Sequence, residues 1–88
     1  MGTTSRLADL WFDLLDGRWV RSGRKASKLL VQGIYVDGEA VWIQVARSEQ
    51  PTSRLLLHVW PQATIRDVLS ALRESPAGKD RIEVLHAA

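Results

Sequence analysis

The sequence predicts a small α+β domain with a mixed sheet of about four strands, in the order α-β-β-β-α-β. Apolar residues recur at three- and four-residue spacing in two segments, residues 5–16 and 64–75, as in amphipathic helices. The dipeptide Asp37-Gly38 separates two segments that are rich in β-branched and aromatic residues, which indicates a hairpin. The chain then continues as a strand–helix–strand unit, which is typical of a right-handed crossover.

The first helix is expected over residues 5–16. Thr3, Thr4 or Ser5 can cap its start, and Gly17 suits the position just beyond its end. Its apolar stripe consists of Leu7, Leu10, Trp11, Leu14 and Leu15.

Residues 18–27 are expected to form a basic loop, because they contain Gly23 and many charges and follow Gly17. From Gly17 to Lys28 the chain carries five basic residues and no acidic residue. The remainder carries seven basic and ten acidic residues, so the small net charge of +2 hides a local concentration of positive charge.

Two strands are expected over residues 28–36 and 39–47, on either side of Asp37-Gly38. If Asp37 and Gly38 are the two turn residues, the numbers of paired residues sum to 75. In this register Trp42 pairs with Gly33, and the indole ring would cover the exposed backbone of the glycine.

A polar connection leads to a third strand over residues 54–60. Thr64, followed by Asp67 three residues later, is a capping pattern for the second helix, residues 64–75. We expect this helix to pack on one face of the sheet. A fourth strand over residues 82–86 would lie parallel to the third.

Side chains of these strands alternate between two faces of the sheet, and both faces are apolar. The face expected to contact the second helix carries Leu30, Ile34, Val41, Ile43, Val45, Leu55, Leu57 and Val59. The other face carries Leu29, Val31, Tyr35, Trp42, Leu56 and Trp60.

Two interpretations of the second face remain open. The first helix could cover it with Trp11, as small α+β domains usually close their own cores. Alternatively a partner covers it, and a homodimer is the commonest such assembly. The sequence favours a small non-catalytic protein-interaction module that self-associates or is a subunit of a larger assembly. Its contact surface would consist of Tyr35, Trp42, Leu56, His58 and Trp60.

The basic segment supports an alternative function, a nucleic-acid-binding module. Lysine and arginine neutralise phosphates, and an indole ring can stack on a base. The residues that would do this are Arg18, Trp19, Arg21, Arg24, Lys25 and Lys28.

The sequence favours no catalytic residue, metal site, cofactor or small-molecule substrate. His58 and His86 lack further ligands at recognisable spacing, and metal sites usually need three or four. The chain contains no Gly-x-Ser-x-Gly sequence and no glycine-rich phosphate loop.

Composition predicts one domain over residues 1–88 in the cytoplasm. The chain has no cysteine, which fits a reducing compartment. Apolar runs such as residues 55–57 are too short to span a bilayer, and the N-terminus lacks the apolar run of a signal peptide.

Two resemblances concern topology. The helix–three strands–helix order is similar to the double-stranded-RNA-binding fold, whose second helix opens with a lysine cluster. Residues 63–67, Ala-Thr-Ile-Arg-Asp, have a single arginine there, so the resemblance does not extend to that family's RNA contacts. The strand and Thr-capped helix of residues 55–72 resemble part of a ubiquitin-like β-grasp domain. The chain ends without the paired glycines of conjugating members, so no conjugation role is implied.

Overall fold

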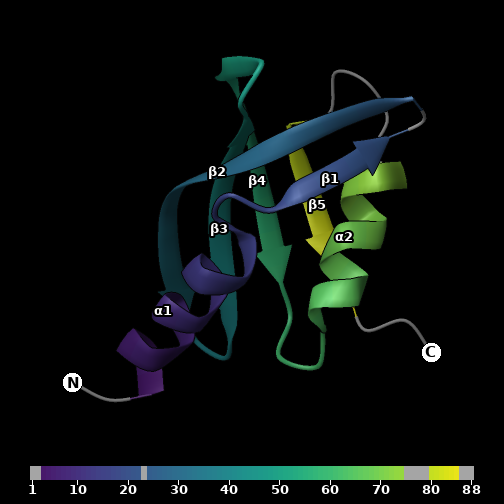
Figure 1. Ribbon diagram of the computed structural model, residues 1–88. Coiled ribbons are helices and arrows are strands. Elements are labelled where there is room, and N and C mark those ends of the chain that lie inside the picture. The colour runs from purple at the N-terminus through teal and green to yellow at the C-terminus, as the bar shows by residue number, and fades with distance from the viewer. Residues whose placement is uncertain (1–2, 23, 75–79, 86–88) are drawn as a thin grey trace.

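The described residues form two helices and a five-stranded mixed sheet (Figure 1), and the α+β class is confirmed. The computed structural model describes residues 3–22, 24–74 and 80–85. The strand order in the sheet is β1-β2-β3-β4-β5, with antiparallel neighbours except for the parallel β4–β5 pair. The elements are α1 (Thr3–Leu15), β1 (Trp19–Ser22), β2 (Lys25–Asp37), β3 (Ala40–Arg47), β4 (Gln50–Val59), α2 (Ile65–Glu74) and β5 (Arg81–Val84).

The expected crossover from β4 through α2 to a parallel β5 is confirmed. Thr64 and Asp67 form the predicted cap of α2, because the Asp67 carboxylate accepts a hydrogen bond of 2.7 Å from the Thr64 backbone N–H. Three predicted features lie outside the described part of the chain: the capping side chains of residues 3–5, residue 75 at the end of the second helix, and His86 at the end of the last strand.

The basic segment is not a loop, contrary to the prediction. Residues 19–22 and 25–28 pair as an antiparallel hairpin, so the order becomes α-β-β-β-β-α-β and departs from the helix–three strands–helix order. Val20 and Ser27, which pair with each other, are 4% and 2% exposed. Burial of Val20 and Ser27 therefore outweighs the repulsion among the charged residues, of which Arg21 and Lys28 lie on the opposite side and Arg24 and Lys25 at the exposed end.

The β2–β3 turn consists of Gly38 and Glu39, and Asp37 pairs with Ala40. The predicted register is therefore wrong by two residues. Gly38 adopts a φ of 62°, which a residue with a side chain rarely adopts, and this fixes the glycine as the first turn residue. A slip of two residues leaves each side chain on its predicted face. The ring that covers Gly33, however, is that of Tyr35 and not that of Trp42.

A β-bulge between Val31 and Gly33 changes the predicted faces of the residues that precede it in β2. The extra residue reverses the alternation, so that Leu29 and Val31 point toward the helices. Leu29 is 1% exposed within the core, and Val31 packs against it. Leu30 takes the opposite side, so the predicted assignments of these three residues are corrected.

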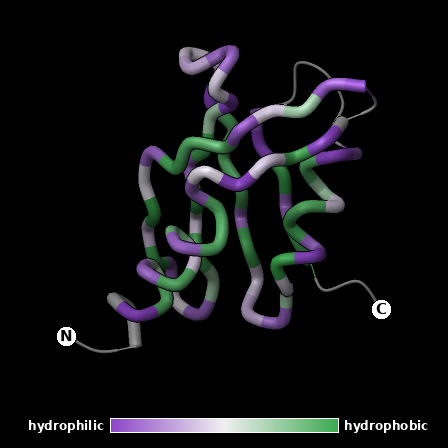
Figure 2. Tube along the Cα trace, in the orientation of Figure 1, coloured by the Kyte–Doolittle hydropathy of each residue, from purple (hydrophilic) through white to green (hydrophobic). Residues whose placement is uncertain are grey.

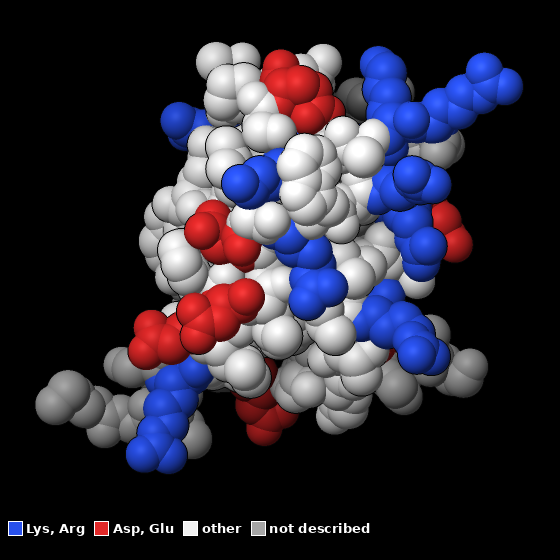
Figure 3. Space-filling view, viewed as in Figure 1, with Lys and Arg blue, Asp and Glu red and all other residues white. Residues whose placement is uncertain are grey.

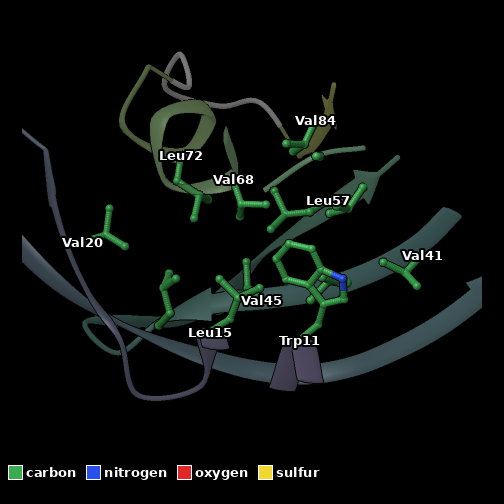
Figure 4. Close-up of a cluster of buried hydrophobic side chains, with 13 residues drawn as sticks. Trp11, Leu15, Val20, Val41, Val45, Leu57, Val68, Leu72 and Val84 are labelled. Atoms are coloured by element: carbon green, nitrogen blue, oxygen red, sulfur yellow. The ribbon is translucent and has the colours of Figure 1, made fainter. Parts of the chain in front are cut away.

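Both helices cover the same face of the sheet (Figure 4). Trp11 and Leu15 of α1 point toward Val68 and Leu72 of α2, and Val45 lies between them. Because both helices lie on one face, the interpretation in which α1 covers the second face of the sheet is excluded.

Figure 2 shows hydrophobic stretches on the strands and on the helices, while the outer end of the β1–β2 hairpin is hydrophilic.

The β1–β2 hairpin lies on the helix side as well, because β2 bends and crosses in front of β3 and β4 (Figure 1). The end of α1 is fixed to β2 by three hydrogen bonds. Gly17 N–H donates to Leu29 O, Leu29 N–H donates to Arg18 O, and Val31 N–H donates to the Asp16 carboxylate. The core is thus enclosed between the helices, the hairpin and one face of the sheet.

In the part of the chain that the structure describes, no helix combines the length and apolar character needed to cross a lipid bilayer.

Candidate functional site

The candidate site is the sheet face that points away from the helices, here called the open face. Strand register places its side chains in two rows across β2, β3, β4 and β5. The first row is Tyr35, Trp42, His58 and Glu83. The second row is Gly33, Gln44, Leu56 and Arg81.

Three aromatic rings form a stack on this face. The Trp42 and His58 rings are nearly parallel, with centroids 3.9 Å apart and an interplanar angle of 3°. Trp60 lies two residues beyond His58 on the same side, and its ring centroid is 4.7 Å from that of His58. The Trp42–His58 pair lies across neighbouring strands, and a cross-strand aromatic pair stabilises a sheet by up to about 1 kcal/mol. The stack therefore makes the centre of the open face rigid.

Polar groups hold the Trp42 ring from two sides. Its indole Nε1–H donates a hydrogen bond of 3.2 Å to the Asp37 carboxylate. The Arg81 guanidinium carbon is 5.3 Å from the centroid of the ring, within the range of a cation–π contact. Trp42 is thus oriented before any partner arrives, which lowers the entropic cost of binding.

Two aromatic side chains project from the open face. Tyr35 is 60% exposed and Trp60 is 38% exposed. Tyr35 lies over Gly33, where an added Cβ would be 3.0 Å from the tyrosine hydroxyl oxygen. The glycine therefore allows the ring to lie close to the backbone while its other side remains in solvent.

His58 is the most buried polar residue of the open face, at 9% exposure. Its Nδ1 lies 3.8 Å from a carboxylate oxygen of Glu83, which is too long for a hydrogen bond. No hydrogen-bond partner of this nitrogen exists among the described residues. The Glu83 side chain is 61% exposed and free to move, so a small displacement of its carboxylate would form the missing bond.

A shallow hollow of about 520 Å³ lies beside the aromatic stack, toward the opposite end of the strands. Arg81 belongs to both features, because it lines the hollow and contacts Trp42. The residues that line the hollow are Gln44, Arg54, Leu55, Leu56, Asp80 and Arg81.

The structure brings together all five predicted contact residues, Tyr35, Trp42, Leu56, His58 and Trp60, on one face. Sequence reasoning missed Arg81, because β5 was not assigned a register against β4. Glu83 was not among the predicted site residues, and Asp37 was predicted only as a turn residue. The signal for Glu83 was its two-residue spacing from Arg81, which places both on one face of a strand.

The residues of the predicted nucleic-acid site lie elsewhere, on and next to the β1–β2 hairpin on the helix side. Arg18 precedes β1, Trp19 and Arg21 lie in β1, and Lys25 and Lys28 lie in β2, while Arg24 occupies the turn. The two predicted surfaces are therefore separate.

Among residues 3–22, 24–74 and 80–85, no group of three or more histidine and carboxylate side chains is placed to hold a metal ion. No family model, curated protein or solved structure matches this chain. The function is therefore inferred from the geometry of the two surfaces.

Proposed function

We propose that this protein is a small protein-interaction module that forms a homodimer through its open face. One observation carries the proposal: α1 and α2 cover the same face of the sheet, and no described segment covers the face with Tyr35, Trp42 and Trp60. An antiparallel sheet face in water usually alternates to polar residues. An uncovered aromatic face of this kind is typical of a protein interface.

A second copy of the chain fits this face in shape. The exposed Trp60 ring lies toward one end of the strands and the hollow lies toward the other, while the Tyr35 ring lies over Gly33 of the second row. A two-fold axis that lies between two facing sheets and runs across their strands exchanges these ends. The Trp60 ring of each protomer would then lie over the hollow of its partner, as an isologous interface requires.

The charges of the open face fit the same symmetry. Glu83 and Asp37 are in or beside the aromatic row, whereas the hollow is lined by two basic residues, Arg81 and Arg54, and one acidic residue, Asp80. The proposed two-fold axis would place Glu83 opposite Arg81 of the other copy, twice per dimer. Such pairing of unlike charges selects a partner and its orientation.

The size of the face is compatible with a weak dimer. Four strands spaced about 4.8 Å apart, over three rows with a repeat of about 7 Å (the two rows above and that of Trp60), offer roughly 400 Å² per protomer. The buried total of about 800 Å² is below the usual size of a stable interface and is typical of a weak one. We therefore expect a dissociation constant in the micromolar range.

Sedimentation equilibrium over about 1–500 μM protein tests the proposal, because a micromolar dimer dissociates within this range. Tyr35→Ser should weaken the dimer by about tenfold or more, since a projecting tyrosine is a common interface anchor. Phe12→Ser is the matched control, because Phe12 is 45% exposed but lies on α1. It should leave the dimer unchanged.

A charge exchange tests the proposed symmetry. Arg81→Glu alone and Glu83→Arg alone should each weaken the dimer, because each places like charges opposite one another. The double variant restores unlike pairs and should recover much of the affinity. If the wild-type protein is monomeric throughout the concentration range, self-association is wrong and only a foreign partner remains for the open face. If the double variant is as weak as the sum of the single changes, the proposed axis is wrong.

A further inference from the structure

We infer that the outer side of the β1–β2 hairpin, together with the adjacent side of α2, binds single-stranded nucleic acid. This surface lies on the helix side of the molecule, away from the open face (Figure 1). It is here called the basic surface. It consists of Trp19, Arg21 and Lys28 on the outer side of the hairpin, Arg24 and Lys25 at its exposed end, and Arg66 and Arg73 of α2; Arg18 lies at its edge, where its Nε–H donates a hydrogen bond to Leu14 O.

The hairpin presents its charges on a fixed support. Val20 and Ser27 anchor its inner side in the protein, at 4% and 2% exposure. Trp19 and Arg21 alternate with Val20 along β1 and therefore point outward, as do their partners Lys28 and Ala26. A support that is already ordered loses little entropy when a ligand binds.

Trp19 is the most exposed of the four tryptophans, at 64%. Its cross-strand partner is Lys28, so both side chains leave the hairpin on its outer side. No ring contact in the described residues involves Trp19, whereas Trp42 and Trp60 stack on His58. An exposed indole ring among cations is the usual combination for stacking one base and holding the adjacent phosphates.

The second helix adds Arg66 and Arg73 to this surface, and the same helix also carries Asp67 and Glu74. Figure 3 shows Lys and Arg atoms gathered over the hairpin and continuing down along α2. The end of α2 with Arg73 lies beside β1, and Arg66 is seven residues earlier, on the same side of the helix.

Nearby acidic groups do not neutralise the outer side of the hairpin. Glu49 accepts a hydrogen bond from Ser27, which is on the inner side. Asp16 accepts a hydrogen bond from the Val31 backbone N–H. Residues 17–28 include five basic and no acidic side chains. The basic surface therefore carries an excess of positive charge, as a phosphate backbone requires.

The exposed indole selects a single strand over a duplex. Bases in a duplex are stacked on one another and offer no free face, whereas unpaired bases do. If five of the basic side chains each contact one phosphate of a single strand, a plot of log affinity against log salt concentration should have a slope of about −3.5.

The experiment is titration of labelled oligothymidylate of about 20 nucleotides at several salt concentrations, with duplex DNA and inorganic polyphosphate as comparison ligands. Trp19→Ala should weaken binding to the oligonucleotide between about fivefold and about 150-fold, the usual range for one stacked base. It should leave the weaker binding to polyphosphate unchanged, because polyphosphate has no bases.

Arg21→Glu and Arg6→Glu form a matched pair, because both side chains are exposed and both changes alter the charge equally. Arg21→Glu should weaken binding and reduce the magnitude of the salt slope, whereas Arg6→Glu on α1 should have a much smaller effect. Circular dichroism of each variant confirms that it is folded. Dimer formation through the open face should be the same in Trp19→Ala and the wild-type protein, so the two proposals can fail separately.

Three results would overturn the inference. They are no binding of oligothymidylate at low salt, equal binding of duplex and single strand, and affinity that is unaffected by both Trp19→Ala and Arg21→Glu.

Discussion

Glu49 shows how one buried hydroxyl group changes the chemistry of an exposed acid. The Ser27 side chain donates a hydrogen bond to the Glu49 carboxylate, and this bond is the main cause of the lowered pKa of Glu49. The backbone N–H of Glu49 and the charge of Arg47 act in the same direction. The contact joins the β1–β2 hairpin to the β3–β4 turn, and so helps to hold the basic surface in place.

This contact predicts a pH dependence of stability. Because the pKa in the folded protein is below the ordinary value of 4.5, the contact stabilises the fold above that pH. Its contribution is lost as the pH falls through the lowered pKa. Ser27→Ala should move the pKa of Glu49 back up toward its ordinary value, as measured by NMR titration of the carboxyl group.

The control for this titration is Ser53→Ala, because Ser53 is an exposed residue of β4. It should leave the Glu49 titration unchanged. Identical titration of Glu49 in the wild-type protein and in Ser27→Ala would show that the hydrogen bond does not set the pKa.

At the scale of elements, the cap of α2 is a predicted feature whose energetic role can be measured. The Thr64 hydroxyl group accepts a hydrogen bond of 3.3 Å from the Asp67 N–H and donates one of 3.0 Å to the Asp67 carboxylate. Thr64→Ala should lower the free energy of unfolding by about 1 kcal/mol in urea denaturation. Thr64→Ser retains the hydroxyl group and should lie within a few tenths of a kcal/mol of the wild-type protein. Equal loss in both variants would contradict the capping role.

Long periodic segments allowed most elements to be predicted from sequence. Four apolar residues at helical spacing identified the second helix, and the β-branched segments identified β3 and β4. The β1–β2 hairpin was missed because its buried side carries only Val20 and Ser27, which is too weak a pattern beside five charges. The bulge after Val31 was missed because an extra residue in a strand has no consistent sequence signal.

At the scale of the whole molecule, the contact residues of the open face could be predicted, but not whether this face is covered. The apolar stripe of α1 could pack on either face of the sheet, so the sequence does not show which face the helix covers. Its position is decided by the hydrogen bonds that fix residues 16–18 to Leu29 and Val31, and these depend on the bulge. Arg81 and the hollow were not predicted either, because they require the register of the parallel β4–β5 pair.

The two proposed functions belong to surfaces on different sides of the molecule. The open face is aromatic and carries charges of both signs, which suits a second copy of the chain. The basic surface is on the helix side, so a face-to-face dimer would leave it accessible on each protomer. A dimer would therefore present two basic surfaces, and linked sites of this kind bind a long single strand more tightly than one site does.

The open face as the dimer interface is tested most directly by an NMR dilution series of the ¹⁵N-labelled protein over about 10–500 μM. We expect the Trp42 indole N–H and the backbone amides of Tyr35, Leu56 and Trp60 to shift with concentration. The indole N–H of Trp19 should not shift, because it lies on the helix side. Concentration-independent spectra, or shifts confined to α1, α2 or the β1–β2 hairpin, would contradict the account.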